Sequence, residues 1–326
     1  MNILITGGAG FLGLRLAKTL LNDGVDGVAA SRLVLADRAT GPDFDDPRVS
    51  YAIGDIADPA FVNRIVTDDI DIVFHLAAVV SGQAEADFDL GLRVNIDASR
   101  LVLNACRHNA DHPRVVFTSS VAVFGPVAAD ETIGDATAVD PRSSYGMEKA
   151  SAELLLKEYS RRGFVDGIVL RLPTISVRPG RPNQAASSFA SGIIREPLSG
   201  SGSPCPVPGS TGLWLLSPRR AVEAMVTAAS LDTSALGTAR VINLPGISVT
   251  VDEMLAVLAD VGGPHARALV TAAPDPAVEK IVASWPRSWD HDRAVGLGFC
   301  GDANFRAIVD AFVEDDLDGQ VAAVAV

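Results

Sequence analysis

A tyrosine and a lysine four residues apart are the residues of this chain best suited to catalysis. Tyr145 and Lys149 stand in the stretch SSYGMEKA, at the predicted start of a helix. An i, i+4 spacing places both side chains on one helix face. An ammonium beside a phenol stabilises the phenolate and lowers the phenol pKa from about 10, which makes the tyrosine a usable base. The same spacing also fits a surface pair on an amphipathic helix.

A serine at the end of a predicted strand favours the catalytic interpretation. Ser120 lies in RVVFTSSVAVF, residues 114–124. Ligands of open parallel sheets bind beyond the carboxyl ends of the strands. We therefore expect Ser120, Tyr145 and Lys149 to form one catalytic site.

A glycine-rich turn separates the first predicted strand from the first predicted helix. The stretch TGGAGFLG would let a pyrophosphate approach the backbone at a helix N-terminus. Asp37 ends the next strand, where a carboxylate can accept hydrogen bonds from both adenosine ribose hydroxyls and would repel a 2′-phosphate. We expect NAD rather than NADP, although Arg38 could accept NADP. The residues of the turn expected to bind the cofactor are Gly7, Gly10, Phe11, Leu12 and Gly13.

These motifs need a scaffold, and the first half of the chain predicts one. Strands that are apolar throughout alternate with helices, which favours a parallel sheet covered on both faces, the doubly wound (Rossmann) α/β fold. The predicted strands are 2–6, 32–38, 49–56, 71–79, 114–124, 166–175 and 239–245, and the predicted helices are 11–24, 59–68, 90–109, 143–163 and 219–230.

The alternation stops after Ile175. Residues 176–212 are rich in Gly, Pro and Ser and too long for a simple connection, which indicates a functional segment. We expect a NAD-binding domain at 1–175, to which 213–245 returns. Residues 176–212 and 246–326 would form a smaller, mainly helical substrate-binding lobe.

Composition narrows the class of protein. The 326 residues carry a formal net charge of −13, which disfavours binding to nucleic acid or to an anionic lipid surface. No apolar run approaches the roughly 20 residues that span a bilayer, and the N-terminus shows no export signal. Three well-separated cysteines favour reduced thiols. We expect a cytoplasmic enzyme without a metal ion.

Taken together, these motifs resemble the extended short-chain dehydrogenases/reductases, the NAD-dependent epimerase/dehydratase group. The resemblance covers the first half of the chain through TGGAGFLG, GDI, HLAA, the strand with Ser120, and Tyr145-x-x-x-Lys149. It implies that Ser120 orients a substrate hydroxyl and that Tyr145 is the general base. Lys149 would lower the tyrosine pKa and hold the nicotinamide ribose. The resemblance also implies a homodimer formed through helices at 91–109 and 144–162.

Further cofactor residues follow from strand ends and from the resemblance. Small residues after the fourth strand would leave room for the dinucleotide or would simply pack a helix on the sheet. The resemblance implies that an asparagine in RVNIDAS supports the active site and that a proline brings backbone against the nicotinamide. The residues concerned are Asp55 and Ile56 near the adenine, Ala77, Ala78, Asn95 and Pro173.

The segment RPGRPNQAASSF, residues 178–189, indicates a small polar substrate. An arginine fork suits a carboxylate, and Arg178 is our candidate, although such arginines can also merely solvate a loop. Most relatives act on sugar nucleotides and grip the diphosphate with an arginine, at whose position this chain has Leu213. The expected substrate residues are Ser81, Ser120, Tyr145, Thr174, Arg178, Asn183, Ser187, Trp214 and Arg219.

The substrate-facing stretches at 77–91, 171–198 and 213–219 resemble the sugar-acid dehydrogenases of this family. That resemblance implies oxidation of the hydroxyl beside the carboxylate, with formation of NADH. Two alternatives stay open: a nucleotide-sugar epimerase or dehydratase, and an NAD sensor without catalysis. Such sensors typically lack the Tyr/Lys pair that this chain retains.

Overall fold

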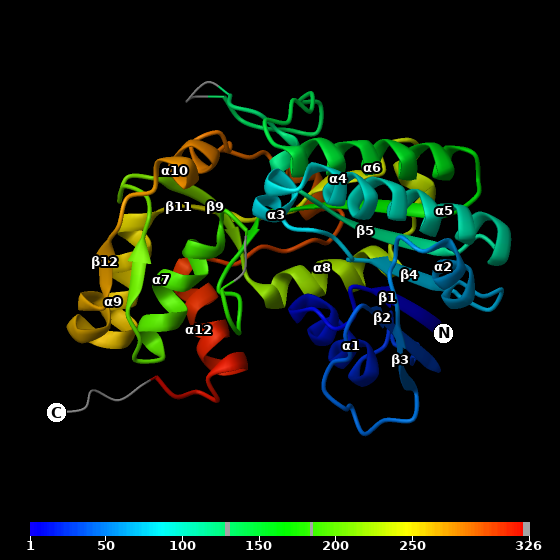
Figure 1. Ribbon diagram of the computed structural model, residues 1–326, viewed down its shortest axis with the longest axis horizontal. Helices are drawn as coiled ribbons and strands as arrows, with labels where there is room; N and C mark the ends of the chain where they lie inside the picture. The colour runs from blue at the N-terminus through cyan, green and yellow to red at the C-terminus, as the bar shows by residue number, and fades with distance from the viewer. Residues whose placement is uncertain (128–130, 183–184, 322–326) are drawn as a thin grey trace. The chain divides into compact units, whose positions relative to one another are not determined.

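Seven strands form the central sheet, in the order β3-β2-β1-β4-β5-β6-β10. The computed structural model describes residues 1–127, 131–182 and 185–321 (Figure 1). Strand β1 pairs in parallel with β2 and β4, and the β2–β3, β4–β5 and β6–β10 pairings are also parallel. The doubly wound fold is therefore confirmed. The strands are β1 (Asn2–Thr6), β2 (Arg32–Asp37), β3 (Val49–Ile53), β4 (Ile72–His75), β5 (Arg114–Ser120), β6 (Asp166–Leu172) and β10 (Val241–Asn243).

The parallel register brings the predicted motifs to one edge of this sheet. Thr6, the last residue of β1, lies opposite Ala36 on one side and His75 on the other. The strand order reverses at β1, which is the switch point where open α/β sheets bind their ligands. The glycine turn after β1 and the Ala77–Ala78 segment after β4 therefore begin next to each other.

Helices cover both faces of the sheet (Figure 1). On one face, α2, α5 and α6 bury Phe61, Val102 and Leu156 in a common core with the strands. The expected helix at 90–109 is instead three segments, because residues 92–97 adopt a π-helix. The helices of this part are α1 (Phe11–Asn22), α2 (Pro59–Ile65), α3 (Ser81–Ala86), α4 (Phe88–Gly91), the π-helix η1 (Leu92–Asp97), α5 (Ala98–Asn109), the 3-10 turn η2 (Val121–Val123), α6 (Ser144–Arg161), α8 (Pro218–Ser230) and the 3-10 turn η3 (Ser234–Leu236).

Some boundaries differ from those expected. Strand β4 ends at His75 rather than at residue 79, and β3 ends at Ile53, so that Asp55 and Ile56 lie in the turn after it. Helix α2 stops at Ile65 because Val66 adopts an extended backbone. The two shortened strands leave loops at the carboxyl edge of the sheet.

The chain divides into two compact units. The first contains Met1–Val123, Ser143–Arg171 and Val222–Asn243, and the second contains Phe124–Arg142, Leu172–Ala221 and Leu244–Val326. Residues 124–142 and 172–175, expected in the NAD-binding domain, and residues 213–221, expected to return to it, thus group with the second unit. We propose that the first unit binds the cofactor and carries the catalytic residues, and that the second unit carries further substrate residues.

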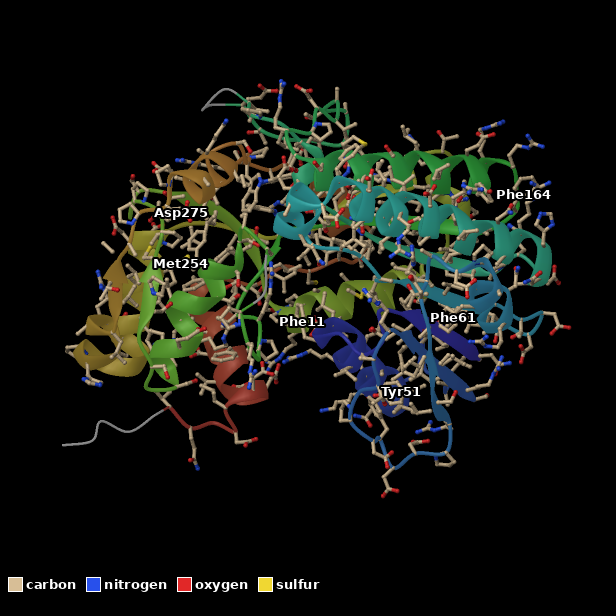
Figure 2. The ribbon with its side chains drawn as sticks, in the orientation of Figure 1. Phe11, Tyr51, Phe61, Phe164, Met254 and Asp275 are labelled. Atoms are coloured by element: carbon tan, nitrogen blue, oxygen red, sulfur yellow. The ribbon has the colours of Figure 1, made fainter. Side chains whose placement is uncertain are left out.

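The second unit packs helices against two small sheets. Helices α7, α9 and α12 share one apolar core, in which Ile193, Met254 and Ile308 are buried. Met254 of α9 and Asp275, the N-cap of α10, are labelled in Figure 2. The sheets, in the orders β11-β9-β7 and β12-β8, were not foreseen in a lobe expected to be mainly helical. The elements are β7 (Thr174–Ile175), α7 (Ser188–Leu198), β8 (Ser203–Cys205), β9 (Gly212–Leu216), β11 (Ile247–Thr250), α9 (Val251–Ala268), β12 (Val270–Ala272), α10 (Pro276–Val282), α11 (Asp292–Gly296) and α12 (Phe305–Asp316).

No helix in the described part of the chain is both long enough and apolar enough to cross a membrane. The cytoplasmic location stays a prediction.

A buried histidine joins β1, β4 and α5. The ring of His75 contacts Thr6 Oγ1 through Nδ1 (2.7 Å) and Ser99 Oγ through Nε2 (3.0 Å). Ser99 donates its own hydrogen to the Asn95 carbonyl (2.7 Å), so it accepts from His75 Nε2. Nδ1 is then the acceptor from Thr6, which is the pattern of a neutral ring. Burial and the nearby Lys149 charge lower the His75 pKa to about 3.

This histidine should make stability depend on pH. Below pH 6.5 the unfolded chain takes up a proton at His75 that the folded chain does not, so stability falls as the pH falls from 6.5 toward 3. We expect the wild type to lose about 2 kcal/mol more than His75→Gln between pH 6.5 and 4.5. Urea denaturation at both pH values measures the difference. The exposed His108 provides the control, since His108→Gln should follow the wild type. Equal losses in wild type and His75→Gln would contradict the neutral ring.

Candidate active site

Lys149 is a buried cation at the carboxyl end of β5. Ser143 caps α6 by accepting from the Gly146 N–H (3.2 Å), which places Tyr145 in the first turn and Lys149 one turn later. Lys149 is 2% exposed and its Nζ donates to the Thr118 carbonyl (2.8 Å). The same Nζ lies 5.8 Å from the centre of the Tyr145 ring. The structure therefore brings the predicted pair together on one helix face, with the lysine charge beside the phenol.

Burial sets the state of this lysine. Removal from water lowers the Lys149 pKa to about 8, while the carboxylates of Glu153 and Glu148 act in the opposite direction. The Phe117 ring lies 4.5 Å from Nζ and gives the ammonium a favourable aromatic face. An ammonium with this pKa can change its charge in the pH range in which a base-catalysed oxidation would run.

Ser120 is the last residue of β5, two residues beyond the carbonyl that holds Lys149. Its Oγ accepts from the Ala122 N–H at the start of η2 (3.1 Å). Helix α6 packs against both β5 and η2. Ser120, Tyr145 and Lys149 thus come from two adjoining elements of the first unit, as the sequence predicted. Their catalytic roles stay predictions.

Asn95 clamps the loop that follows β4. Its side chain donates to the Val79 carbonyl (3.0 Å) and accepts from the Val79 N–H (2.9 Å). Its Nδ2 also donates to Oε2 of the fully buried Glu148 (2.6 Å). Burial raises the Glu148 pKa. The predicted asparagine therefore couples the Ala77–Ala78 loop to the residue directly before Lys149.

A second buried network was missed by sequence reasoning. Glu153 accepts from Arg171 of β6 at both carboxylate oxygens (2.9 and 2.6 Å) and from the Ser119 hydroxyl (2.5 Å). Glu148 and Glu153 both stand on α6 beside the lysine. Their spacing from Lys149, one residue before and four after, is the only sequence signal for them.

The glycine turn fits a dinucleotide. A Cβ on Gly13 would lie 2.5 Å from the Gly7 carbonyl oxygen, and one on Gly7 would lie 2.8 Å from the Ala77 nitrogen. Side chains are thus excluded where a pyrophosphate would approach. Helix α1 begins at Phe11 (Figure 2) and has neither a capping side chain nor an acidic residue in its first turn, so its N-terminal end suits an anion.

The carboxylate of Asp37 stands at this turn. It accepts from the backbone N–H of Ala9 (3.0 Å) and of Arg38 (2.7 Å), at the end of β2. Asp55 is paired with Arg93 (2.7 Å), an interaction that holds the pKa of that carboxyl low. Ile56 is buried beside it. Asp37 fits the expected ribose contact, whereas the Asp55 charge is already matched by an arginine.

The predicted substrate residues fall in both units. Ser81 begins α3 of the first unit. In the second unit, Thr174 of β7 lies opposite Leu215, the neighbour of Trp214 in β9. A Cβ on Gly246 would lie 2.9 Å from Trp214 Nε1 and 3.0 Å from Pro173 Cγ, so the indole and the predicted cofactor proline face the same small space.

The structure brings Arg178 and Ser187 together. Arg178 donates from Nε to the Ile175 carbonyl (2.9 Å) and from Nη2 to Ser187 Oγ (2.9 Å). Its backbone is tied to α7 through Ser191 Oγ (3.0 Å) and Arg195 Nη1 (2.7 Å). The guanidinium is therefore held in place before any substrate arrives.

Two other predicted substrate residues, Arg219 and Asn183, differ from Arg178 and Ser187. Arg219 forms ion pairs with Glu314 (2.9 Å) and Asp315 (2.7 Å) at the end of α12, which raise its pKa. Its charge is thus matched within the second unit, which argues against a substrate role. Asn183 lies outside the described residues.

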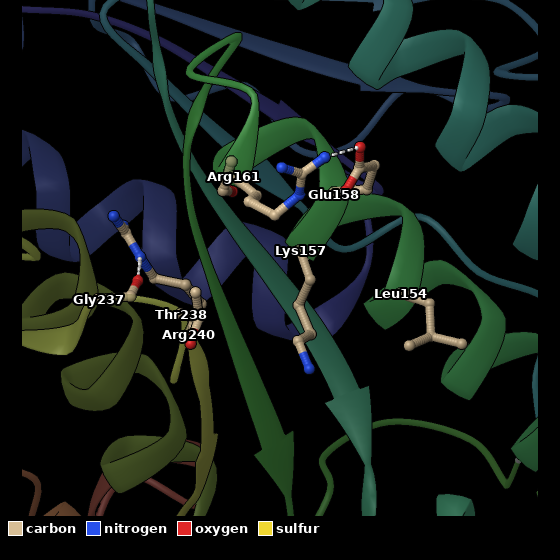
Figure 3. Close-up of a pocket in the computed structure, with 8 residues that line it drawn as sticks. Leu154, Lys157, Glu158, Arg161, Gly237, Thr238 and Arg240 are labelled. Carbon is tan, nitrogen blue, oxygen red and sulfur yellow. Dashed lines mark hydrogen bonds and ion pairs between the residues drawn. The ribbon is translucent and has the colours of Figure 1, made fainter.

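A hollow in the first unit lies away from this site. It is formed by the C-terminal half of α6 and the turn before β10 (Figure 3), whereas Tyr145 and Lys149 stand in the first two turns of α6. Both arginines of its lining are already bonded, Arg161 to Glu158 and Arg240 to the Gly237 carbonyl. Its lining residues are Leu154, Lys157, Glu158, Ser160, Arg161, Gly237, Thr238 and Arg240.

Comparison with known proteins agrees with this geometry. Residues 3–228 match the model of the NAD dependent epimerase/dehydratase family. The chain is 56% identical over 324 residues to a D-erythronate dehydrogenase of Cupriavidus necator, covering 97% of this chain and 98% of that protein. It is 46% identical over 319 residues to a D-erythronate dehydrogenase of Haemophilus influenzae, covering 97% and 100%.

A solved structure gives the same result for the fold. The crystal structure of a nucleoside-diphosphate-sugar epimerase from Agrobacterium tumefaciens is 40% identical, with a TM-score of 0.92, and the match covers 99% of this chain and 96% of that one. The fold and site define an NAD-dependent oxidoreductase. The chain belongs to the NAD dependent epimerase/dehydratase family. The expected family, the dehydrogenase class and the cofactor NAD are thereby confirmed.

The negative charge of Glu148 should affect the pKa of Lys149. Glu148→Gln keeps an oxygen that can accept from Asn95 but removes a negative charge that raises the Lys149 pKa. We expect the Lys149 pKa to fall below about 8, and the alkaline limb of the kcat/KM profile to move to lower pH.

Glu158→Gln on the same helix is the matched control. Glu158 is exposed and bonded to Arg161, so loss of the Glu158 charge should leave the pH profile of kcat/KM unchanged. An unchanged profile for Glu148→Gln would show that this carboxylate does not act on the lysine.

Proposed function

We propose that this protein is an NAD-dependent dehydrogenase of a small sugar acid, with D-erythronate as substrate and 2-oxo-D-erythronate as product. The observation that carries the proposal is the buried Lys149 ammonium beside Tyr145, in a chain whose relatives are named D-erythronate dehydrogenase. That geometry suits removal of a hydroxyl proton, which an oxidation at a CH–OH carbon requires.

The residues of the first unit take separate roles. Tyr145, as the phenolate, removes the proton from the substrate hydroxyl, and Lys149 lowers the pKa of the phenol. Ser120 donates a hydrogen bond that orients this hydroxyl. NAD, when bound, supplies the acceptor for the hydride that leaves the substrate carbon.

The same unit holds the cofactor. The glycine turn and the N-terminus of α1 suit the pyrophosphate, and Asp37 suits the ribose hydroxyls. Ala77, Ala78 and Asn95 shape the loop after β4, and Lys149 holds the nicotinamide ribose.

Arg178 is proposed to bind the substrate carboxylate. Two hydrogen bonds from its guanidinium, to Ile175 and Ser187, fix the group beside β7. A fixed arginine fork matches the two oxygens of a carboxylate and loses little conformational freedom on binding. Because Arg178 binds the carboxylate, the hydroxyl on the adjacent carbon is the one selected for oxidation. Ser187 is bonded to this guanidinium, and Thr174 precedes Ile175, whose carbonyl the guanidinium also holds.

A panel of acids tests the proposal. Purified protein is mixed with NAD and with C4, C5 and C6 aldonic acids, and NADH absorbance is followed. D-Erythronate should give one NADH per molecule oxidised. The similarity to the Agrobacterium tumefaciens epimerase supports a rival activity, nucleotide-sugar epimerisation, in which NAD is regenerated and no NADH accumulates. Conversion of a sugar nucleotide without NADH would replace our proposal with that one.

Removing the base should separate chemistry from cofactor binding. Tyr145→Phe keeps the ring but loses the proton acceptor, so turnover should fall by about 10² or more while the NAD dissociation constant stays within a factor of about three. Stopped-flow turnover and NAD titration measure the two quantities. Tyr159→Phe, on the same helix and weakly bonded to Asn104 (3.4 Å), should keep normal turnover. Near-normal turnover in Tyr145→Phe would exclude Tyr145 as the base.

Loss of Arg178 should affect acids in particular. A hydrogen bond to a charged group contributes about 1.5–3 kcal/mol, so Arg178→Ala should lower kcat/KM for D-erythronate by about one to two powers of ten. The kcat/KM for the neutral polyol erythritol, which we expect to be low in the wild type, should hardly change. Arg181→Ala is the control, because Arg181 is an exposed arginine of the same segment. If the wild type oxidises erythritol as readily as D-erythronate, the enzyme does not recognise the carboxylate.

A further inference from the structure

Four aromatic rings of the second unit form what we call the aromatic cluster: Phe124, Trp214, Trp289 and His291. Trp214 and Trp289 stack with ring centres 5.8 Å apart and planes 24° apart. Phe124 meets Trp289 edge-on at 5.2 Å, and His291 lies 5.8 Å from Trp214. The cluster thus joins rings from three separate stretches of the chain.

The cluster is firmly built. Trp214 stands on β9, whose neighbours β7 and β11 pair with it on both sides. The backbone around Trp289 is bonded to Ile133 on both sides, through the Ser288 carbonyl (2.9 Å) and the Asp290 N–H (2.7 Å). Both tryptophans are 7% exposed. Their ring positions are therefore set by the scaffold.

Three buried nitrogen atoms of this cluster have no hydrogen-bond partner among the described residues. They are Nε1 of Trp214, Nε1 of Trp289 and Nδ1 of His291, and they make up three of the five such side-chain atoms found there. The other two belong to the carboxylates of Glu148 and Glu196. A buried indole N–H normally has a partner, because leaving it unpaired costs free energy. Three together point to a ligand with several oxygen atoms.

The cluster adjoins a residue of the proposed cofactor site. A Cβ on Gly246 would lie within 2.9 Å of Trp214 Nε1 and 3.0 Å of Pro173 Cγ. Glycine at this position leaves the indole N–H and the proline side by side. Pro173 is the residue that the family resemblance places against the nicotinamide, so Trp214 and this expected cofactor contact share one small space of the second unit.

We propose that the aromatic cluster is the subsite for the hydroxylated end of the sugar acid. The indole N–H groups of Trp214 and Trp289 donate to the substrate hydroxyl oxygens, and His291 Nδ1 bonds a further hydroxyl. The faces of the aromatic rings pack against the C–H groups of the substrate's carbon chain. This inference rests on the proposed function and adds to it. Arg178 binds the carboxylate, and the aromatic cluster binds the hydroxyl groups at the other end of the substrate.

Binding should change the surroundings of the indoles. Both N–H groups are buried, so a substrate reaches them only when neighbouring side chains move aside. The chain has three tryptophans, and the third, Trp285, lies outside the cluster. A Trp285→Phe protein therefore reports only on the cluster through its fluorescence.

Two acids separate the cluster from the carboxylate. 2-Hydroxybutyrate has the same four carbons and the same carboxylate end as D-erythronate but lacks the two distal hydroxyls. Trp214→Phe and Trp289→Phe keep an aromatic ring and remove one donor each. We expect each to raise KM for D-erythronate about tenfold, the factor that corresponds to 1.4 kcal/mol, while kcat/KM for 2-hydroxybutyrate changes less than twofold. Trp285→Phe should change neither.

Two results would contradict the proposed subsite. Equal losses for both acids would mean that the tryptophans only support the fold, and no loss for D-erythronate would mean that their N–H groups do not touch it. Either overturns the inference. If the wild type forms no NADH from any aldonic acid, the proposed function fails by itself. Titration of Trp285→Phe fluorescence with D-erythronate then decides on the subsite, which is refuted if no saturable change appears.

Discussion

The site depends on keeping one positive charge out of water. Burying an ammonium costs several kcal/mol unless partners replace its hydration. Around Lys149 these partners are the Thr118 carbonyl, the face of the Phe117 ring and the carboxylates of Glu148 and Glu153. Helix α6 must therefore lie against β5 at a fixed depth. The position of Tyr145, one turn before the lysine, follows from that constraint.

A continuous set of buried hydrogen bonds links this charge to the glycine turn. Thr6, at the end of β1, bonds His75, which bonds Ser99, and Ser99 bonds the Asn95 backbone. The Asn95 side chain then reaches Glu148, the residue before the lysine. Hydrogen bonds in such a chain polarise one another in a low-dielectric interior. Cofactor loop and catalytic helix are thus parts of one buried network within the first unit.

Sequence reasoning found the features that local patterns encode. The strand–helix alternation predicted the sheet, and the Tyr145–Lys149 spacing and the glycine turn predicted what stands at its edge. It missed Glu148 and the His75 contacts, because partners far along the chain decide whether a buried polar group is satisfied. Arg219 shows the same limit: its partners are about 95 residues away. The cluster was anticipated only in Trp214, since Trp289 and His291 join it through tertiary packing.

The π-helical segment at residues 92–97 carries an evolutionary consequence. A π-turn corresponds to one extra residue within an α-helix, and π-turns often occur at functional sites. Removing one residue before Asn95 would let this segment relax to a regular helix and would turn the asparagine by about 100°, away from Val79 and Glu148. The relaxed helix would have better backbone bonds but no clamp on the cofactor loop. Selection for that clamp would therefore preserve chain length here more strictly than side-chain identity on the outer face of the same helix.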